Sequence, residues 1–217
     1  MTPRTRHLVG GGIVLLTAVA SVLASPEMPA EMVTHWNTEG PNGTMDRTLA
    51  LAGLPALAAA LLTMFELLPR VDPLGEHITD LGRYYDLLVM VVVGLIAYVH
   101  GIVIAWNLGY DFAVVQAVAP AVAVVYFVAG VVIARVDKNW FVGIRTPWTL
   151  SSDRVWERTH ARGAVLFKAS AVLALGAVAL PEYAMAFLVG PIAVSALYLT
   201  VYSYLEYRRV GADDAGA

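Results

Sequence analysis

Long apolar runs separated by short polar segments dominate this chain. Six runs have, or nearly have, the about 20 residues that an α-helix needs to cross the ~30 Å hydrocarbon core of a bilayer. They cover residues 8–24, 49–69, 87–106, 113–134, 164–181 and 184–205. Only Glu182 and Tyr183 follow Pro181 before the last run begins, which predicts a tight antiparallel hairpin. The pattern predicts an all-α polytopic membrane protein with six transmembrane helices.

The composition agrees with a membrane protein. Of the 217 residues, 59% are hydrophobic and 14% are charged, whereas soluble domains have roughly 45–50% apolar and ~25% charged residues. The net charge is −3 and no basic tract is present, so we expect no direct contact with nucleic acid. The chain has no cysteine, which excludes disulfides and thiol chemistry.

Basic residues predict the orientation in the membrane, because loops rich in lysine and arginine stay in the cytoplasm. Of the 14 basic residues, Arg47 lies in an opposite loop and Lys168 inside the fifth run. The others occupy the termini and the second and fourth loops: Arg4, Arg6, Arg70, Arg83, Arg135, Lys138, Arg145, Arg154, Arg158, Arg162, Arg208 and Arg209. We therefore expect a multi-pass protein of the cell (plasma) membrane with the N- and C-termini cytoplasmic.

The first run has a second interpretation. Arg4 and Arg6 precede it and small residues close it, as in a cleavable signal peptide. Five further runs favour its retention as an anchor. In both cases the segment from Ser25 onward emerges outside.

The outer loop, residues 25–48, is acidic and rich in turn-forming residues. Glu27, Glu31, Glu39 and Asp46 outnumber the single Arg47. Such a loop would attract a cationic or amphipathic partner, although a solvated connector that caps the helix ends accounts for the same residues. His35 and Glu39 lie within reach of one metal ion, but two ligands without a third do not make a site, so we expect no metal.

The fourth loop contains the segment KNWFVGIRTPWTLSSDRVWERTH, residues 138–160. Gly143 and Pro147 bracket Arg145, which argues against regular helix there. Ser151 or Ser152 is placed to N-cap a helix that leads into the fifth run. That helix is amphipathic and fits the membrane surface, either as an interfacial anchor or as a recognition surface. Its two faces carry Val155, Trp156 and Thr159, and Arg154, Arg158 and Arg162.

The stretch from Asn139 to Leu150, followed by Trp156 and His160, resembles the signature of the SdpI family, multi-pass membrane proteins named for immunity against a secreted killing peptide. The outer stretch THWNTEGPNG, residues 34–43, resembles the pattern of an uncharacterised N-terminal domain that often precedes the SdpI region. The resemblance implies an N-terminal two-helix membrane region, residues 1–70, and an SdpI-like four-helix region, residues 71–217. The candidate binding or motif residues are Asn139, Gly143, Arg145, Thr146, Pro147, Trp148, Trp156, His160, His35, Asn37 and Gly40.

The function that this resemblance implies is non-catalytic. It is immunity to a secreted membrane-active toxin peptide, envelope-stress signalling through the cytoplasmic loop, or both. Membrane lipids, a toxin peptide outside and a cytoplasmic repressor inside are the partners that follow, with no cofactor. The residues themselves leave two roles open for the motif: Arg145 can hold a phosphate or a carboxylate, or Asn139, Thr146 and Thr149 can satisfy backbone groups at the bends.

A small-solute transporter, or an accessory subunit of one, is the alternative function. A transporter needs a polar path near the middle of the membrane, and His100, Gln116 and Ser170 make a thin one. We expect His100 to make a packing hydrogen bond more readily than to relay protons. Glu66 lies near a span end and is expected to reach toward the surface. Gly94 and Gly101 are expected to permit close helix packing.

Overall fold

The computed structural model describes residues 2–37 and 39–215 and is mainly helical. Within this part, six helices are long and apolar enough to cross a membrane. They are α1 (Pro3–Ala24), α2 (Arg47–Val71), α4 (Arg83–Asn107), α5 (Val114–Ile133), α7 (Asp153–Ala174) and α9 (Ala184–Ala215). Each overlaps one of the predicted runs, so the all-α polytopic architecture is confirmed.

Short elements connect these helices. They are the 3-10 turns Ser25–Glu27 and Pro181–Tyr183, and the short helices α3 (Gly75–Asp80), α6 (Pro147–Ser151) and α8 (Gly176–Ala179). In addition, β1 (Glu31–Asn37) and β2 (Gly40–Asp46) pair as an antiparallel hairpin. Asp46 ends β2 and caps α2, because its carboxylate accepts the backbone N–H of Thr48 at 2.8 Å. The sequence predicted turns in this segment but not the two strands.

The hairpin is fixed to the ends of the helices beneath it. Met32 of β1 is fully buried and packs with Leu51 of α2 and Val103 of α4. Asn107, the last residue of α4, donates its amide N–H to the carbonyl of Val33 and accepts the N–H of Val33, both at 2.9 Å. The side chain of Asn107 thus pairs with β1 as a neighbouring strand would. The outer loop is therefore a docked cap on the helices.

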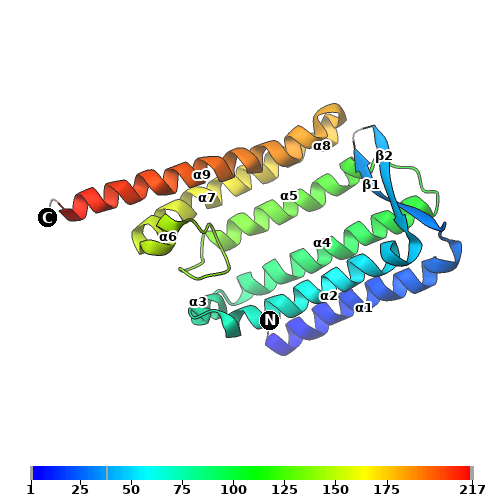
Figure 1. Ribbon diagram of the computed structural model, residues 1–217, viewed down its shortest axis with the longest axis horizontal. Coiled ribbons are helices and arrows are strands. Elements are labelled where there is room, and N and C mark those ends of the chain that lie inside the picture. Colours follow the sequence, from blue (N-terminus) through cyan, green and yellow to red (C-terminus); the bar gives the residue numbers. More distant parts are fainter. Residues whose placement is uncertain (1, 38, 216–217) are drawn as a thin grey trace.

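Figure 1 shows how the spans are arranged. Helices α1, α2 and α4 pack on one another, α5 packs on α4, and α7 packs between α5 and α9. The hairpin and α8 lie at one end of the molecule, whereas α3 and α6 lie at the other, with the start of α1 and the end of α9 (Figure 1). Packing is continuous across residue 70, and the division into regions 1–70 and 71–217 stays a prediction. Which end faces the cytoplasm is likewise a prediction.

The helix before the fifth span was predicted to lie at the membrane surface. For its apolar face, this prediction is wrong. Helix α7 runs without a break from Asp153 into the span. Val155, Trp156 and Thr159 are buried in the protein, with Trp156 only 2% exposed. Because α7 packs against both α5 and α9, this face meets other helices and not lipid headgroups.

Close helix packing also occurs at glycines other than those predicted. A Cβ atom added to Gly94 or Gly101 would meet nothing within 4 Å. A Cβ on Gly130 of α5 would instead lie 3.0 Å from the carbonyl oxygen of Ala164. One on Gly163 of α7 would collide with the Cδ1 atom of Ile144. Gly130 thus lets α5 approach the backbone of α7, whereas Gly163 makes room for a side chain of the loop between these helices.

Candidate functional site at the signature loop

Asn139 organises the loop that carries the motif, residues 138–150, which we call the signature loop. Its side chain is fully buried. The amide nitrogen donates to the carbonyls of Asp137 and Val142, both at 2.9 Å. The amide oxygen accepts the backbone N–H groups of Phe141 at 2.9 Å and Val142 at 2.6 Å. An asparagine is required because one planar group must both donate and accept.

Gly143 brings the loop against α7. Its φ is +120°, a region that favours glycine, and an added Cβ would lie 2.5 Å from Nε2 of His160. His160 Nε2 accepts the N–H of Ile144 at 2.9 Å, and Nδ1 lies 2.8 Å from the Trp156 carbonyl. The histidine therefore carries its proton on Nδ1 and is neutral, and it stacks on Trp156 with ring centroids 3.9 Å apart. Both ring nitrogens are engaged.

The TPWT part of the motif builds the start of α6. Thr146 and Thr149 form a reciprocal capping box, and Pro147 occupies the first turn, where it needs no hydrogen-bond partner. Thr146 Oγ1 also donates to Ser203 Oγ of α9 at 3.0 Å. Trp148 packs on Tyr204 of α9, with ring centroids 5.1 Å apart. These contacts attach the loop to the last helix.

Asp72, which follows α2, contacts the signature loop, and the sequence did not predict this contact. One carboxylate oxygen accepts the N–H of Leu74 at 2.8 Å, as an Asp before a proline turn commonly does. The other accepts the N–H of Trp140 at 3.0 Å. The first bond is local and has a sequence signal, but the second joins residues 68 positions apart and has none. The signature loop is thus fixed to α2, α7 and α9.

Arg145 is the charged residue of the motif stretch from Asn139 to Leu150, and its side chain is exposed. Its Nη1 donates to the carbonyl of Trp140, which holds the guanidinium beside the loop. Among the residues that the structure describes, no carboxylate lies within ion-pair distance of it. By contrast, Lys138 pairs with Asp153, and Arg135 lies over the Tyr84 ring at 4.4 Å. Most of the hydrogen-bonding capacity of Arg145 is available to a molecule outside the chain.

The outer motif residues shape the tip of the hairpin. Asn37 accepts the N–H of Glu39 at 2.9 Å, and Gly40 has φ of +128°, which a tight turn of this kind requires. His35 is exposed, and its Nδ1 lies 2.9 Å from Thr34 Oγ1. In the described part of the chain, no group of three or more His, Cys, Asp or Glu side chains is arranged to hold a metal ion.

Asn37 and Gly40 also line a cavity of about 310 Å³ at this end of the molecule. Three separate segments form it: the hairpin, the loop between α4 and α5, and the turn before α9. Trp106 of α4 makes edge-on contacts with Trp36 and Phe112, each with centroids 5.8 Å apart. The other functional groups in its lining are Glu39, Asp111 and Gln116. The cavity combines aromatic rings with carboxylates, and none of the described residues that line it is basic.

Comparison with known proteins agrees with both motifs. Residues 135–203 match the SdpI/YfhL protein family, and residues 12–59 match a domain of unknown function, DUF1648. The chain is 20% identical over 207 residues to the immunity protein SdpI of Bacillus subtilis (strain 168), covering 94% of this chain and 97% of that protein. The resemblance to the SdpI family is confirmed. No solved structure matches the chain.

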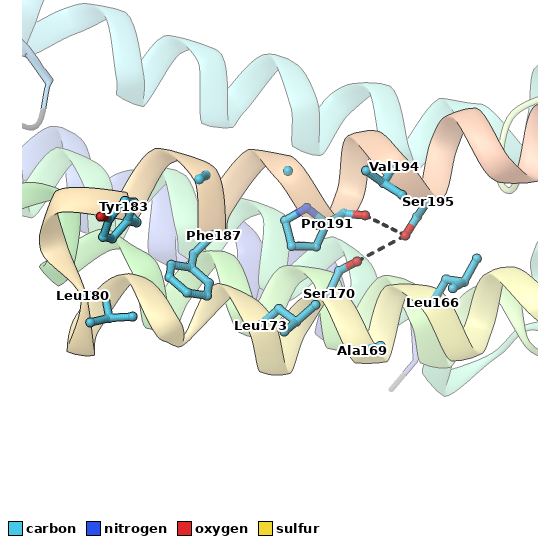
Figure 2. Close-up of a pocket in the computed structure, with 12 residues that line it drawn as sticks. Leu166, Ala169, Ser170, Leu173, Leu180, Tyr183, Phe187, Pro191, Val194 and Ser195 are labelled. Carbon is cyan, nitrogen blue, oxygen red and sulfur yellow. Dashed lines mark hydrogen bonds between the residues drawn. The ribbon is translucent and has the colours of Figure 1, made fainter.

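The SdpI match includes α7 and the first part of α9, and these two helices enclose an apolar groove of about 640 Å³ (Figure 2). Tyr183 and Phe187 lie toward one end of the groove. The polar contacts are Ser195 donating to the carbonyl of Pro191 at 2.7 Å and Ser170 lying 3.4 Å from Ser195. Each hydroxyl is thus used within the helix pair. In a membrane, such an apolar surface is covered by lipid chains and has no charged group to select a ligand.

Outside both matched segments, a cluster of charged residues joins α1, α2 and α4. Arg6 makes two parallel hydrogen bonds to Glu66, each 2.8 Å long, and a third to Asp86 at 2.9 Å. All three side chains are largely buried. The expectation that Glu66 reaches toward the surface is therefore wrong, because a cation from α1 is close enough to neutralise it. The sequence placed Arg6 only as a topology signal.

Proposed function

We propose that this protein confers immunity to a secreted membrane-active peptide, acting in the cell membrane by binding and without catalysis. The observation that carries the proposal is the similarity to an immunity protein over 94% of the chain and 97% of that relative. The geometry supports a binding role, because the side chains of Asn139, Thr146 and His160 are used in internal hydrogen bonds. A nucleophile or general base would need such groups to be available to a substrate.

The outer cavity is the part of the molecule that fits such a peptide. Carboxylates beside aromatic rings favour cationic groups, through charge attraction and through cation–π contacts. Glu39 and Asp111 supply the charge, while Trp36 and Trp106 supply the rings. The proposal places this end outside the cell, as the distribution of basic residues predicts. A cationic amphipathic peptide would meet the cavity as it arrives at the membrane.

The experiment compares cells that lack the gene with cells that carry it, challenged with a synthetic cationic amphipathic peptide. Loss of the gene should increase killing. The double variant Glu39→Gln/Asp111→Asn should restore less protection than the wild type at equal abundance. Glu27→Gln/Glu31→Gln is the matched control, because it removes the same charge from exposed residues outside the lining of the cavity. If deletion changes only the uptake or efflux of a small solute, the transporter alternative replaces immunity.

Signalling through the signature loop to a cytoplasmic repressor rests on the family resemblance. The loop does present exposed side chains, Trp140 and Phe141 beside Arg145. Asn139, Thr146 and Thr149 are buried, which limits a protein contact to the exposed edge of the loop. Transcript profiles of the wild type and an Arg145→Ala strain after peptide challenge would test the idea. Identical profiles in the two strains would argue against signalling through this loop.

A further inference from the structure

A crevice of about 430 Å³ lies under the signature loop, between α2 and α7. Phe65 of α2 and Phe167 of α7 contribute to opposite walls, and Leu88 of α4 and Ile133 of α5 line it between them. This volume falls within the roughly 300–1,000 Å³ range of small-molecule sites. The walls belong to membrane spans, and a hydrocarbon chain is the material available at that depth.

Arg145 is the charged residue in the lining of this crevice. It stands where α2 and α5 end and α7 begins, which is the level of lipid headgroups for a chain with these spans. Its guanidinium is oriented by the Trp140 carbonyl and has no carboxylate partner among the described residues. Trp140 and Phe141 beside it are 50% and 43% exposed, as interfacial aromatics are.

The geometry points to a binding site for one anionic phospholipid in the leaflet on the signature-loop side. The lipid phosphate accepts hydrogen bonds from Arg145, and one acyl chain occupies the crevice between α2 and α7. A guanidinium group binds phosphate through two donors at once, whereas the ammonium group of lysine acts as a point charge. This difference explains why an arginine occupies this position. A soluble protein would reach Arg145 but not the apolar walls, so a lipid uses both parts of the site. This inference does not depend on the proposed immunity function.

The test uses the full chain, reconstituted in vesicles of equal parts phosphatidylcholine and phosphatidylglycerol and then extracted in mild detergent. Native mass spectrometry counts the lipids that each molecule retains. The wild type should retain one phosphatidylglycerol in preference to phosphatidylcholine. Arg145→Ala should lower that preference at least about tenfold, since a charge-assisted hydrogen-bond pair is lost. Arg145→Lys should be intermediate.

Two further variants separate the site from general effects. Arg208→Ala removes an exposed basic residue outside the crevice and should retain phosphatidylglycerol as the wild type does. Ala129→Phe fills the crevice from α5 while keeping Arg145, and it should also lose the retained lipid. This variant keeps the test decisive if Arg145→Ala folds poorly.

Three results would overturn the inference. The first is equal retention of both lipids by the wild type. The second is the same lipid preference in Arg145→Ala as in Arg208→Ala. The third is unchanged lipid retention in Ala129→Phe. If Arg145→Ala keeps its lipid but loses the transcriptional response to peptide, the residue serves a protein partner and the lipid site is wrong.

Discussion

At the scale of single residues, the signature motif combines internal connections with one exposed charged group, Arg145. Asn139 closes the first bend, Gly143 lets the backbone approach His160, and Thr146 joins α6 to α9. The sequence left a structural and a recognition role open for these positions. Their contacts assign a structural role to these three positions. Arg145 differs, because it has no carboxylate partner in the described part of the chain.

Gly143 should tolerate no side chain. Gly143→Ala places a Cβ 2.5 Å from His160 Nε2 and forces alanine to adopt φ of +120°. We expect a loss of at least about 1–3 kcal/mol in unfolding free energy from the backbone strain alone. Thermal unfolding in detergent, followed by tryptophan fluorescence, measures it. Gly94→Ala is the control, because a Cβ there meets nothing within 4 Å, and it should unfold no more readily than the wild type does. Equal melting of the two variants would contradict this account of Gly143.

Asn139→Asp tests the other bend. The carboxylate keeps both acceptor contacts but cannot donate to the carbonyls of Asp137 and Val142. Each buried carbonyl left without a donor costs about 1–3 kcal/mol, and the buried charge adds to this. We expect low abundance in the membrane and a lower melting temperature, measured by immunoblot and by the same unfolding assay. A stable Asn139→Asp protein would show that the loop does not depend on these donors.

At the scale of elements, the six spans were predictable and the features between them only partly so. Apolar length determines a transmembrane helix, and that information is local. The β1–β2 hairpin depends on Asn107, which lies 74 residues from Val33 and pairs with it. From the sequence alone, a helix face that carries Trp156 fits a membrane surface and a protein core equally well. The structure shows that Trp156 is buried in the protein core, where its indole N–H donates to the Val136 carbonyl at 2.9 Å.

The charged cluster of α1, α2 and α4 belongs to this scale too. Breaking a buried ion pair by removing one partner leaves the other charge uncompensated, which costs about 3–5 kcal/mol. Arg6→Met and Glu66→Leu should each destabilise the protein strongly. The double variant should lose clearly less than the sum of the two, because no unpaired charge from this pair remains.

A double-mutant cycle of thermal unfolding gives the coupling energy of Arg6 and Glu66. Arg4→Met is the control, since Arg4 is exposed at the start of the same helix, and it should change little. Strict additivity of Arg6→Met and Glu66→Leu would mean that the two charges contribute independently and that their pairing does not hold α1 to α2.

At the scale of the whole molecule, charge is distributed unequally between the two ends. The end with α3 and α6 (Figure 1) contains Arg145 of the signature loop and, near the end of α9, Arg208. The hairpin end has Glu39 and Asp111 at its cavity. This polarity fits a protein that meets a cationic peptide on one side and anionic lipid on the other. Both proposals therefore depend on which end is outside.

The orientation can be measured directly because the chain has no cysteine to interfere. Asn42→Cys lies in the exposed hairpin and Ser151→Cys at the end of α6, and both positions are exposed. A membrane-impermeant maleimide should label Asn42→Cys in intact cells, but Ser151→Cys only after permeabilisation, because basic loops resist translocation. The wild type should remain unlabelled throughout. The opposite pattern would put Arg145 in the outer leaflet and the carboxylate cavity in the cytoplasm, where an arriving peptide could not reach it.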